Sequence, residues 1–316
     1  MEPTIDDDGI DRRGFLGCMA WAGTAVVLSA CGGSVTSRAV GHATSGGARA
    51  DFTFAQISDS HIGFNHAPNS DVVGTYEQAI ARINALPQRP AFVIHTGDHV
   101  HLSTPDEFDT VKQLTSTIKS DRTFHVPGEH DVFVDQGKLY RRFFGKGSRG
   151  SGYYSFDYGG VHFLALANVQ ASESETGNGP NGLGKLGAEQ IAWVKRDLKA
   201  QSADTPLVVF GHVPLLAVYP KWGWATSDSA QVLTLLRRFS SVTVLNGHIH
   251  QVLSKHEGNV TMHTANATAF PQHHPGDGAP GPYELPAADL PRMLGIRAVK
   301  FVRGRSRLAL TDETLA

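Results

Sequence analysis

The chain has 316 residues, of which 41% are hydrophobic and 18% charged, and its formal net charge at pH 7 is −2. This length allows one large domain with a buried core, and the lack of a basic excess argues against a nucleic-acid-binding protein. Both cysteines, Cys18 and Cys31, lie within the first 31 residues, which excludes a disulfide framework and thiolate metal ligands from the rest of the chain.

The first thirty residues resemble a bacterial export signal. Arg12 and Arg13 form a twin-arginine pair, the apolar stretch 15–30 follows, and small residues precede Cys31. We expect residues 1–30 to be a twin-arginine signal peptide. The alternative is a retained membrane anchor, but the apolar stretch is shorter than the roughly 20 residues that span a bilayer.

Residues 28–31, with the sequence Leu-Ser-Ala-Cys, also resemble a lipobox, in which Cys31 becomes the lipidated first residue of the mature protein. An ordinary cleavage region of small residues is the alternative. We therefore expect an exported protein, periplasmic or anchored to a membrane by a lipid on Cys31. The small, polar residues 31–50 are typical of a flexible linker, and residues 51–316 are expected to form the domain.

Strands and helices alternate from residue 52 onward. The patterns predict strands at 52–58, 91–96, 124–127, 153–158, 161–167, 207–211, 242–246, 251–256, 260–263, 296–302 and 307–310, and helices at 72–86, 104–119, 185–200 and 228–239. Helices that alternate with strands, followed by closing hairpins, favour an α/β fold with two packed mixed β-sheets flanked by helices.

Side chains that can bind metal ions follow five of the expected strands. They are Asp59 and His61, then Asp98, then Glu129, His130 and Asp131, then His212, and finally His248 and His250. Asp59 and His61 would share a face in extended backbone, and Gly97 would allow the chain a close approach beside Asp98. Because open α/β sheets collect their chemistry at strand ends, we expect one crevice with two metal ions.

The order Asp59-x-His61, Gly97-Asp98, Gly128-Glu129-His130-Asp131, Gly211-His212, Gly247-His248-x-His250 resembles the motif series of the calcineurin-like metallophosphoesterases. The resemblance covers nearly all of residues 52–310 and implies a four-layer metallophosphoesterase fold with a dinuclear metal site at strand ends. It implies that one ion is held by Asp59, His61 and His250, that the other is held by Glu129, His212 and His248, and that Asp98 bridges them.

The resemblance also implies an activity. The protein would be a metal-dependent phosphoric ester hydrolase, a phosphomonoesterase or phosphodiesterase, in which a hydroxide bridging two ions of Fe, Mn or Zn attacks phosphorus. His130 would be the catalytic residue that protonates the leaving oxygen or stabilises its charge. The substrate would be a small phosphoester: a nucleotide, a sugar phosphate or a phospholipid head group. The alternative is a non-catalytic metal-binding surface lipoprotein derived from this fold.

Glu129 stands where the family pattern normally has Asn, so the site gains a negative charge and one methylene of reach. Our hypothesis is that Glu129 favours a more highly charged metal pair, such as one containing Fe(III), or otherwise weakens the attraction for anionic substrates. The rival interpretation is that Glu129 points away and leaves the second metal site weak or empty.

His101 stands where several branches of the family have an Asp that orients the catalytic imidazole. Asp131 is a possible substitute, and His99 and His101 are either site residues or ordinary loop residues. Purple acid phosphatases have a tyrosine three residues after the bridging Asp, and because this chain has His101 there, no charge-transfer colour is expected.

Two loops could influence substrate choice. The segment 215–227 contains Tyr219, Lys221, Trp222 and Trp224, so it could cap a base, a sugar or a lipid head group, or it could simply pack against the neighbouring helix. The segment 171–184 is rich in Ser, Glu, Gly and Asn and is expected to be a mobile surface loop near the active face.

Overall fold

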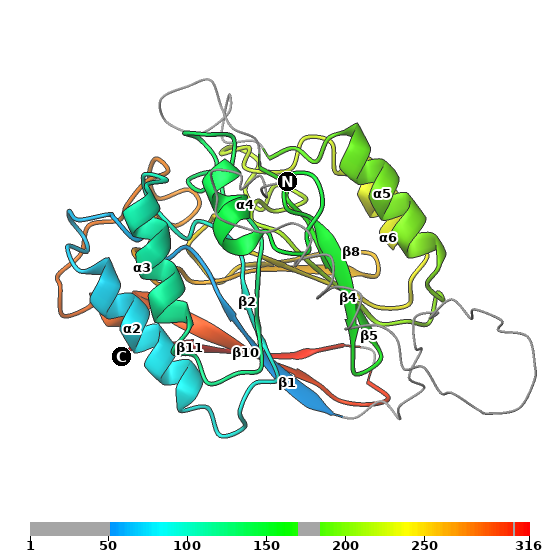
Figure 1. The fold of residues 1–316 in the computed structure, drawn as a ribbon, viewed down its shortest axis with the longest axis horizontal. Helices are drawn as coiled ribbons and strands as arrows, with labels where there is room; N and C mark the ends of the chain where they lie inside the picture. The colour runs from blue at the N-terminus through cyan, green and yellow to red at the C-terminus, as the bar shows by residue number, and fades with distance from the viewer. Residues whose placement is uncertain (1–50, 170–183, 306) are drawn as a thin grey trace, which may run out of the picture. The chain divides into compact units, whose positions relative to one another are not determined.

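The computed structural model describes residues 51–169, 184–305 and 307–316. In these residues two β-sheets pack face to face and helices cover their outer faces, so the elements form four layers (Figure 1). This arrangement confirms the expected α/β fold with two packed mixed sheets.

The first sheet has the strand order β11-β10-β1-β2-β3. Its strands are β1 (Phe52–Ile57), β2 (Val93–His95), β3 (Thr123–His125), β10 (Gly295–Phe301) and β11 (Ala309–Thr314). β1, β2 and β3 run parallel, whereas β10 is antiparallel to both β1 and β11. The carboxyl ends of β1, β2 and β3 therefore meet at one edge of the sheet.

The second sheet has the order β4-β5-β6-β7-β9-β8. Its strands are β4 (Tyr154–Tyr158), β5 (Val161–Ala165), β6 (Leu207–Phe210), β7 (Val242–Asn246), β8 (Ser254–Glu257) and β9 (Val260–Thr264). The four central strands, β5, β6, β7 and β9, are parallel to one another. The strands β4 and β8 form the two edges of the sheet and are antiparallel to their neighbours. As in the first sheet, several carboxyl ends share one edge.

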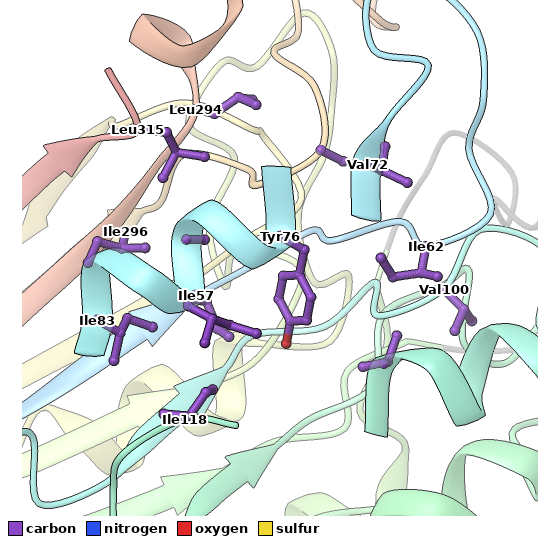
Figure 2. Close-up of a cluster of buried hydrophobic side chains, with 14 of the residues drawn as sticks. Ile57, Ile62, Val72, Tyr76, Ile83, Val100, Ile118, Leu294, Ile296 and Leu315 are labelled. Atoms are coloured by element: carbon purple, nitrogen blue, oxygen red, sulfur yellow. The ribbon is translucent and has the colours of Figure 1, made fainter. Parts of the chain in front are cut away.

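The strand β1 shows how the layers are held together. Its side chains alternate: Phe52 and Phe54 belong to the apolar cluster between the sheets, and Ala55 and Ile57 belong to the cluster beneath the helices. Figure 2 shows Tyr76 and Ile83 of one covering helix packed over Ile57. Because both faces of β1 are covered, its apolar run is nearly continuous, as is typical of a central parallel strand.

The covering helices fall into two groups. In the first group α2 (Val72–Asn84) and α3 (Pro105–Thr115) pack on the first sheet. In the second group α5 (Ala188–Lys199) and α6 (Ala230–Leu236) pack on the second sheet (Figure 1). Both groups leave the loops at the carboxyl edges of the sheets free to form a site.

The structure differs from the sequence prediction in two short helices and in element lengths. The helices α4 (Lys138–Phe144) and α7 (Leu290–Met293) were not predicted. α4 follows Gly137, which has a φ of 73° and no side chain of its own to cap the helix. The carboxylate of Asp135 instead accepts the backbone N–H groups of Lys138 and Leu139, so the cap does not stand at the position where a helix-start signal is expected. β11 lies a few residues later than expected, and α3 ends four residues earlier than expected.

Several predictions lie outside the described residues. They are the signal peptide, the lipobox, the linker and all but the last residue of the loop 171–184. Within the described residues, no helix is both long and apolar enough to cross a bilayer.

Candidate metal centre

The loops that follow β1, β2, β3, β6 and β7 converge at the carboxyl edges of the two sheets. They bring together, fully or almost fully buried, the seven metal ligands expected from the sequence: Asp59, His61, Asp98, Glu129, His212, His248 and His250. These side chains come from strand ends up to 191 residues apart in sequence, so only the parallel topology of the sheets places them side by side.

Three of the side chains form a first triad: Asp59, His61 and His250. Nε2 of His250 lies 3.3 Å from Nε2 of His61 and 3.3 Å from Oδ1 of Asp59. The three donor atoms thus face a common point.

Glu129, His212 and His248 form a second triad. Oε1 of Glu129 lies 2.8 Å from Nδ1 of His248, and its Oε2 lies 2.8 Å from Nε2 of His212. The carboxylate therefore faces its triad, which disagrees with the interpretation that Glu129 points away.

Asp98 lies between the two triads. Its Oδ2 is 3.5 Å from Nε2 of His61 in the first triad and 3.3 Å from Nε2 of His212 in the second. One carboxylate oxygen thus reaches both groups, as a bridging ligand must.

The donor set fits metal ions. Bonds of about 2.0–2.2 Å from nitrogen or oxygen to one ion leave neighbouring donor atoms about 3–3.5 Å apart, close to the separations seen in both triads. Nε2 of His212, Nε2 of His248 and Oε2 of Glu129 are buried and make no hydrogen bond within the described residues. Nε2 of His212 and Oε2 of Glu129 are close, but their geometry is not that of a hydrogen bond. Buried polar atoms without partners are costly unless a metal completes them.

The electrostatics also favour bound cations. Burial and the neighbouring Glu129 raise the pKa of Asp98. Burial alone would raise the pKa of Glu129, but His248 and His212 outweigh it and hold the pKa well below its usual range. Asp98 and Glu129 in turn raise the pKa of His212 well above its usual value, against the effect of burial. The carboxylates are thus crowded together out of water, and positive charge would stabilise them.

In three of the four candidate histidine ligands, the ring nitrogen that faces away from the centre has a partner. Nδ1 of His212 donates to the carbonyl of Thr96 at 2.7 Å, and Nδ1 of His250 donates to the carbonyl of Phe270 at 2.7 Å. In the same way, Nδ1 of His61 lies 3.4 Å from Nδ1 of His101. These contacts aim Nε2 of His61, His212 and His250 at the centre, as outer partners of metal-binding histidines do. In His248 it is Nδ1 that faces Glu129, at 2.8 Å.

The backbone of the ligand loops is unusual. Five of the candidate ligands have a positive φ, between 39° and 69°, which residues other than glycine rarely adopt. They are Asp59, His61, Asp98, His248 and His250. The expectation that Asp59 and His61 stand in extended backbone is therefore wrong. Strained backbone of this kind is held only where the surrounding structure enforces it, and such residues concentrate at functional sites.

The ligand loops approach each other so closely that two positions in them have no room for a side chain and are glycines. Gly97 has a φ of 98°, and a Cβ there would meet Nδ1 of His212 at 2.6 Å. A Cβ on Gly128 would meet Oδ1 of Asp98 at 2.0 Å. Any larger residue at either position would push the ligand loops apart, as the sequence led us to expect for Gly97.

The predicted catalytic residue His130 lies beside the first triad, with its ring 4.7 Å from that of His61. Its Nδ1 donates to the carbonyl of His101 at 2.8 Å, and its backbone N–H donates to Oδ1 of Asp98 at 2.9 Å. Burial lowers the pKa of His130, but Asp98 and Glu129 outweigh this and raise it. The imidazole is therefore oriented by a main-chain carbonyl and biased toward its protonated form.

The suggestion that Asp131 orients His130 is wrong. Oδ2 of Asp131 pairs with Nδ1 of His99 at 2.9 Å and accepts the backbone N–H of Gly128 at 2.8 Å. Its other oxygen accepts the backbone N–H of His99 at 2.9 Å. Asp131 therefore ties the loop after β3 to the loop after β2, and His99 belongs to this fully buried support rather than to the site.

Comparison with known proteins relates the chain to a described group of enzymes. The family model for calcineurin-like phosphoesterases matches residues 52–252. A glycerophosphodiester phosphodiesterase, GpdQ, from Enterobacter lignolyticus is 26% identical over 227 residues, which cover 68% of this chain and 76% of that protein.

Solved structures share the fold at low sequence identity. A dimetal phosphatase from Danio rerio superposes with a TM-score of 0.56 at 16% identity, covering 84% of this chain and 99% of the other. The purple acid phosphatase PPD1 of yellow lupin superposes with a TM-score of 0.58 at 12% identity, covering 84% of this chain and 52% of the other.

Proposed function

Since this chain belongs to the calcineurin-like phosphoesterase family and is a metal-dependent hydrolase of phosphoric esters, we propose that Asp59, His61, Asp98, Glu129, His212, His248 and His250 hold its two ions. The observation that carries this proposal is the convergence of all seven donor groups, with three unpartnered buried atoms among them. When bound, two cations would lower the pKa of a water nucleophile and neutralise phosphoryl oxygens.

The chain's own residues supply the rest of the reaction. His130 donates a proton to the oxygen that leaves phosphorus, because its Nδ1 is held by the carbonyl of His101 and its Nε2 remains for the substrate. Asp98 accepts the backbone N–H of His130, so the position of this acid is tied to the metal centre.

The test is hydrolysis of p-nitrophenyl phosphate and bis(p-nitrophenyl) phosphate with Mn, Fe and Zn supplied in turn. His130→Ala should lower kcat by about 10²–10⁴-fold, the usual contribution of a general acid, while the bound metal content stays unchanged. Unchanged turnover in this variant would exclude the role of His130.

We propose further that Glu129 selects a metal pair containing a trivalent ion such as Fe(III). Asp59, Asp98 and Glu129 bring three negative charges into a buried site. Two divalent ions would leave a formal charge of +1, whereas a trivalent and a divalent ion would leave +2, which attracts a phosphoester more strongly.

Metal analysis of protein matured in its own host tests the choice of metals, and Glu129→Asn is the matched variant because Asn removes only the charge and one methylene. We expect iron in the native protein and a lower ratio of iron to zinc in the variant. Two zinc ions with full activity would contradict the proposal.

For the substrate, we propose a small phosphoester: a nucleotide, a sugar phosphate or a phospholipid head group. The similar protein named above is a glycerophosphodiester phosphodiesterase, which supports including diesters in the test. A non-catalytic metal-binding surface lipoprotein is the alternative, and it predicts metal binding without turnover of any ester.

We also propose export through a twin-arginine signal, with a lipid on Cys31 as the membrane anchor. The order of Arg12 and Arg13, an apolar stretch and small residues before Cys31 supports this. Changing both arginines to lysine should leave the protein in the cytoplasm, and Cys31→Ala should release it from membranes. Unaltered periplasmic delivery of the double lysine variant would contradict the proposal.

A further inference from the structure

A row of aromatic side chains leads away from the metal centre along the loop between β6 and α6. The ring of Trp224 lies 4.8 Å from that of His248, Trp222 lies 5.0 Å from Trp224, and Tyr219 lies 5.6 Å from Trp222. We call Tyr219, Trp222 and Trp224 the aromatic row. All three are only partly buried.

The loop that carries the aromatic row is held in place by hydrogen bonds. At its ends the backbone N–H of Thr226 donates to the carbonyl of Pro214 at 2.8 Å. In its middle, Nζ of Lys255 donates to the carbonyl of Ala217 at 2.9 Å, and the backbone N–H of Trp222 donates to the carbonyl of Tyr219 at 3.1 Å. A ligand that used these rings would meet a loop that is already ordered.

Core packing does not account for the aromatic row. The apolar cluster on this face of the second sheet takes Leu215 and Leu216 from the loop but none of the three rings. The loop 214–226 contains no Asp, Glu, Asn or Gln, and its one charged residue is the exposed Lys221. It offers ring faces and a positive charge but few groups that could bind sugar hydroxyls.

We propose that the aromatic row is a subsite for a planar aromatic group esterified to the phosphate, as in a nucleotide or an aryl phosphoester. This rests on the proposed function and narrows its substrate class. Because Trp224 contacts His248, a ligand whose phosphoryl group binds at the metal centre can extend its ester substituent along the row. Stacking on these rings is the recognition that such a group allows.

Two ligands that differ in the presence of an aromatic base test the proposal. Adenosine 5′-monophosphate and ribose 5-phosphate share a phosphate and a ribose, and only the first has a base. With the metal-loaded full chain, we expect the first to bind about tenfold more tightly, the effect of one base stacked on an aromatic side chain. Because both ligands are phosphoesters that the protein can hydrolyse, their affinities are measured as competitive inhibition constants against p-nitrophenyl phosphate. Tryptophan fluorescence should respond mainly to the ligand with the base.

Substitutions in the aromatic row should weaken the binding of adenosine 5′-monophosphate and leave that of ribose 5-phosphate nearly unchanged. Trp224→Leu and Trp222→Leu should remove most of the tenfold difference, while the affinity for ribose 5-phosphate changes less than twofold. Trp224→Phe keeps a ring and should restore part of the difference. Trp193→Phe is the matched control, because Trp193 packs against Tyr153 in the core and not in the row.

Two results would overturn the subsite. One is equal affinity for both ligands in the unaltered protein, and the other is an equal loss of both in Trp224→Leu. Either result, found together with hydrolysis of p-nitrophenyl phosphate, would refute the aromatic subsite alone. Binding of neither ligand and hydrolysis of no ester would instead refute the proposed function.

Discussion

The metal centre and the surroundings of Arg297 are two buried polar regions that behave in opposite ways. The guanidinium of Arg297, on β10, is 1% exposed, and each of its nitrogens has a partner: Asp312 at 2.8 Å, Gln56 at 3.2 Å and the carbonyl of Thr264 at 2.8 Å. In the metal centre, by contrast, three buried atoms have no hydrogen-bond partner in the part of the chain that the structure describes. A buried polar group whose partners are all in the chain serves the fold, whereas unpartnered donor atoms gathered at one point leave room for a ligand.

The two regions are also connected. Nε2 of Gln56 donates to Oγ1 of Thr96 at 3.1 Å and to the carbonyl of Asn246 at 3.2 Å. The carbonyl of Thr96 in turn accepts Nδ1 of the candidate ligand His212. The network around Arg297 therefore joins both sheets directly behind the metal centre, and it should hold the ligand loops in place whether or not metal is bound.

Removing Asp98 should break the metal centre without weakening the fold. We expect Asp98→Asn to lower kcat/KM by about three orders of magnitude or more, because it alters the one carboxylate oxygen that reaches both triads. The metal-free variant should unfold at no lower denaturant concentration than the metal-free parent, because burial and Glu129 already disfavour the charge on Asp98. Metal analysis, kinetics and urea unfolding check these results.

The exposed Asp121, paired with Arg89 on the surface, provides the control: Asp121→Asn should change none of the three measurements. If the metal-free Asp98→Asn protein proved markedly less stable than the parent, the carboxylate would have a structural role that this comparison denies.

Arg297→Met should show the reverse pattern. Truncating one partner of a buried ion pair typically costs 3–5 kcal/mol of unfolding free energy. The cost here should be about 3 kcal/mol, since Asp312 remains 31% exposed and keeps part of its hydration. The folded variant should still bind two ions per chain. Arg292→Met, at an exposed ion pair, should cost under about 0.5 kcal/mol, and equal losses in the two variants would refute the structural role of Arg297.

His101 supports the metal centre from outside, through its contact with His61. Burial, together with His130 and His66, lowers the pKa of His101 to about 4, so its Nδ1 can accept the Nδ1–H of His61. His101→Leu should weaken metal binding about 10–100-fold, as loss of an outer partner usually does. His101→Asn places an amide acceptor near the same point and should recover part of the affinity. Because the carbonyl of residue 101 remains in both variants, the pH profile of the reaction should shift little. A metal titration checks the order, and identical affinities in both variants would contradict it.

The smallest effect is expected far from the centre, at His162. Burial lowers the pKa of His162, but hydrogen bonds to Asp197 and Asp157 outweigh burial and raise it. A raised pKa in the folded state stabilises the protein fully below the usual value of 6.5, and this contribution disappears as pH rises through the folded-state pKa.

The stability gap between the parent and His162→Gln should therefore be largest near pH 5–6 and smaller at pH 9. Urea unfolding of both proteins at each pH measures it, and metal-linked effects common to both cancel in the difference. If the stability difference between the two proteins grew as the pH rose, the raised pKa of His162 would be contradicted.

The sequence singled out the candidate ligands because they follow apolar runs at strand ends and because their order resembles the motif series of the family. It could not predict the backbone: the positive φ of Asp59, His61 and Asp98 is imposed by crowding of loops from different parts of the chain, and short-range patterns do not record such crowding. The helix α4 was not predicted because its N-cap residue is Gly137, and the side chain that caps its first turn, Asp135, lies two residues earlier.

Arg297 and Asp131 show the same limit for buried polar residues. An arginine within a strand looks like a solvent-facing residue until the second sheet supplies the carbonyl of Thr264. Asp131 looked like a partner for its neighbour His130, but its actual partner His99 is 32 residues away in sequence. Which polar groups meet depends on tertiary contacts, and a single sequence does not reveal these.

The number of metal ions bound per chain, measured together with thermal unfolding of the same proteins, tests the central claim most directly. Protein purified without added metal, together with His212→Ala and Arg297→Met, would be analysed for bound metals and unfolded with and without a chelator. We expect about two ions per chain in the parent and in Arg297→Met, fewer in His212→Ala, and a drop in the Tm of the parent when metal is removed. A parent protein that holds no metal as purified, takes up none when Mn, Fe or Zn is then supplied, and keeps the same Tm with a chelator would contradict the assignment of these seven residues as a metal centre.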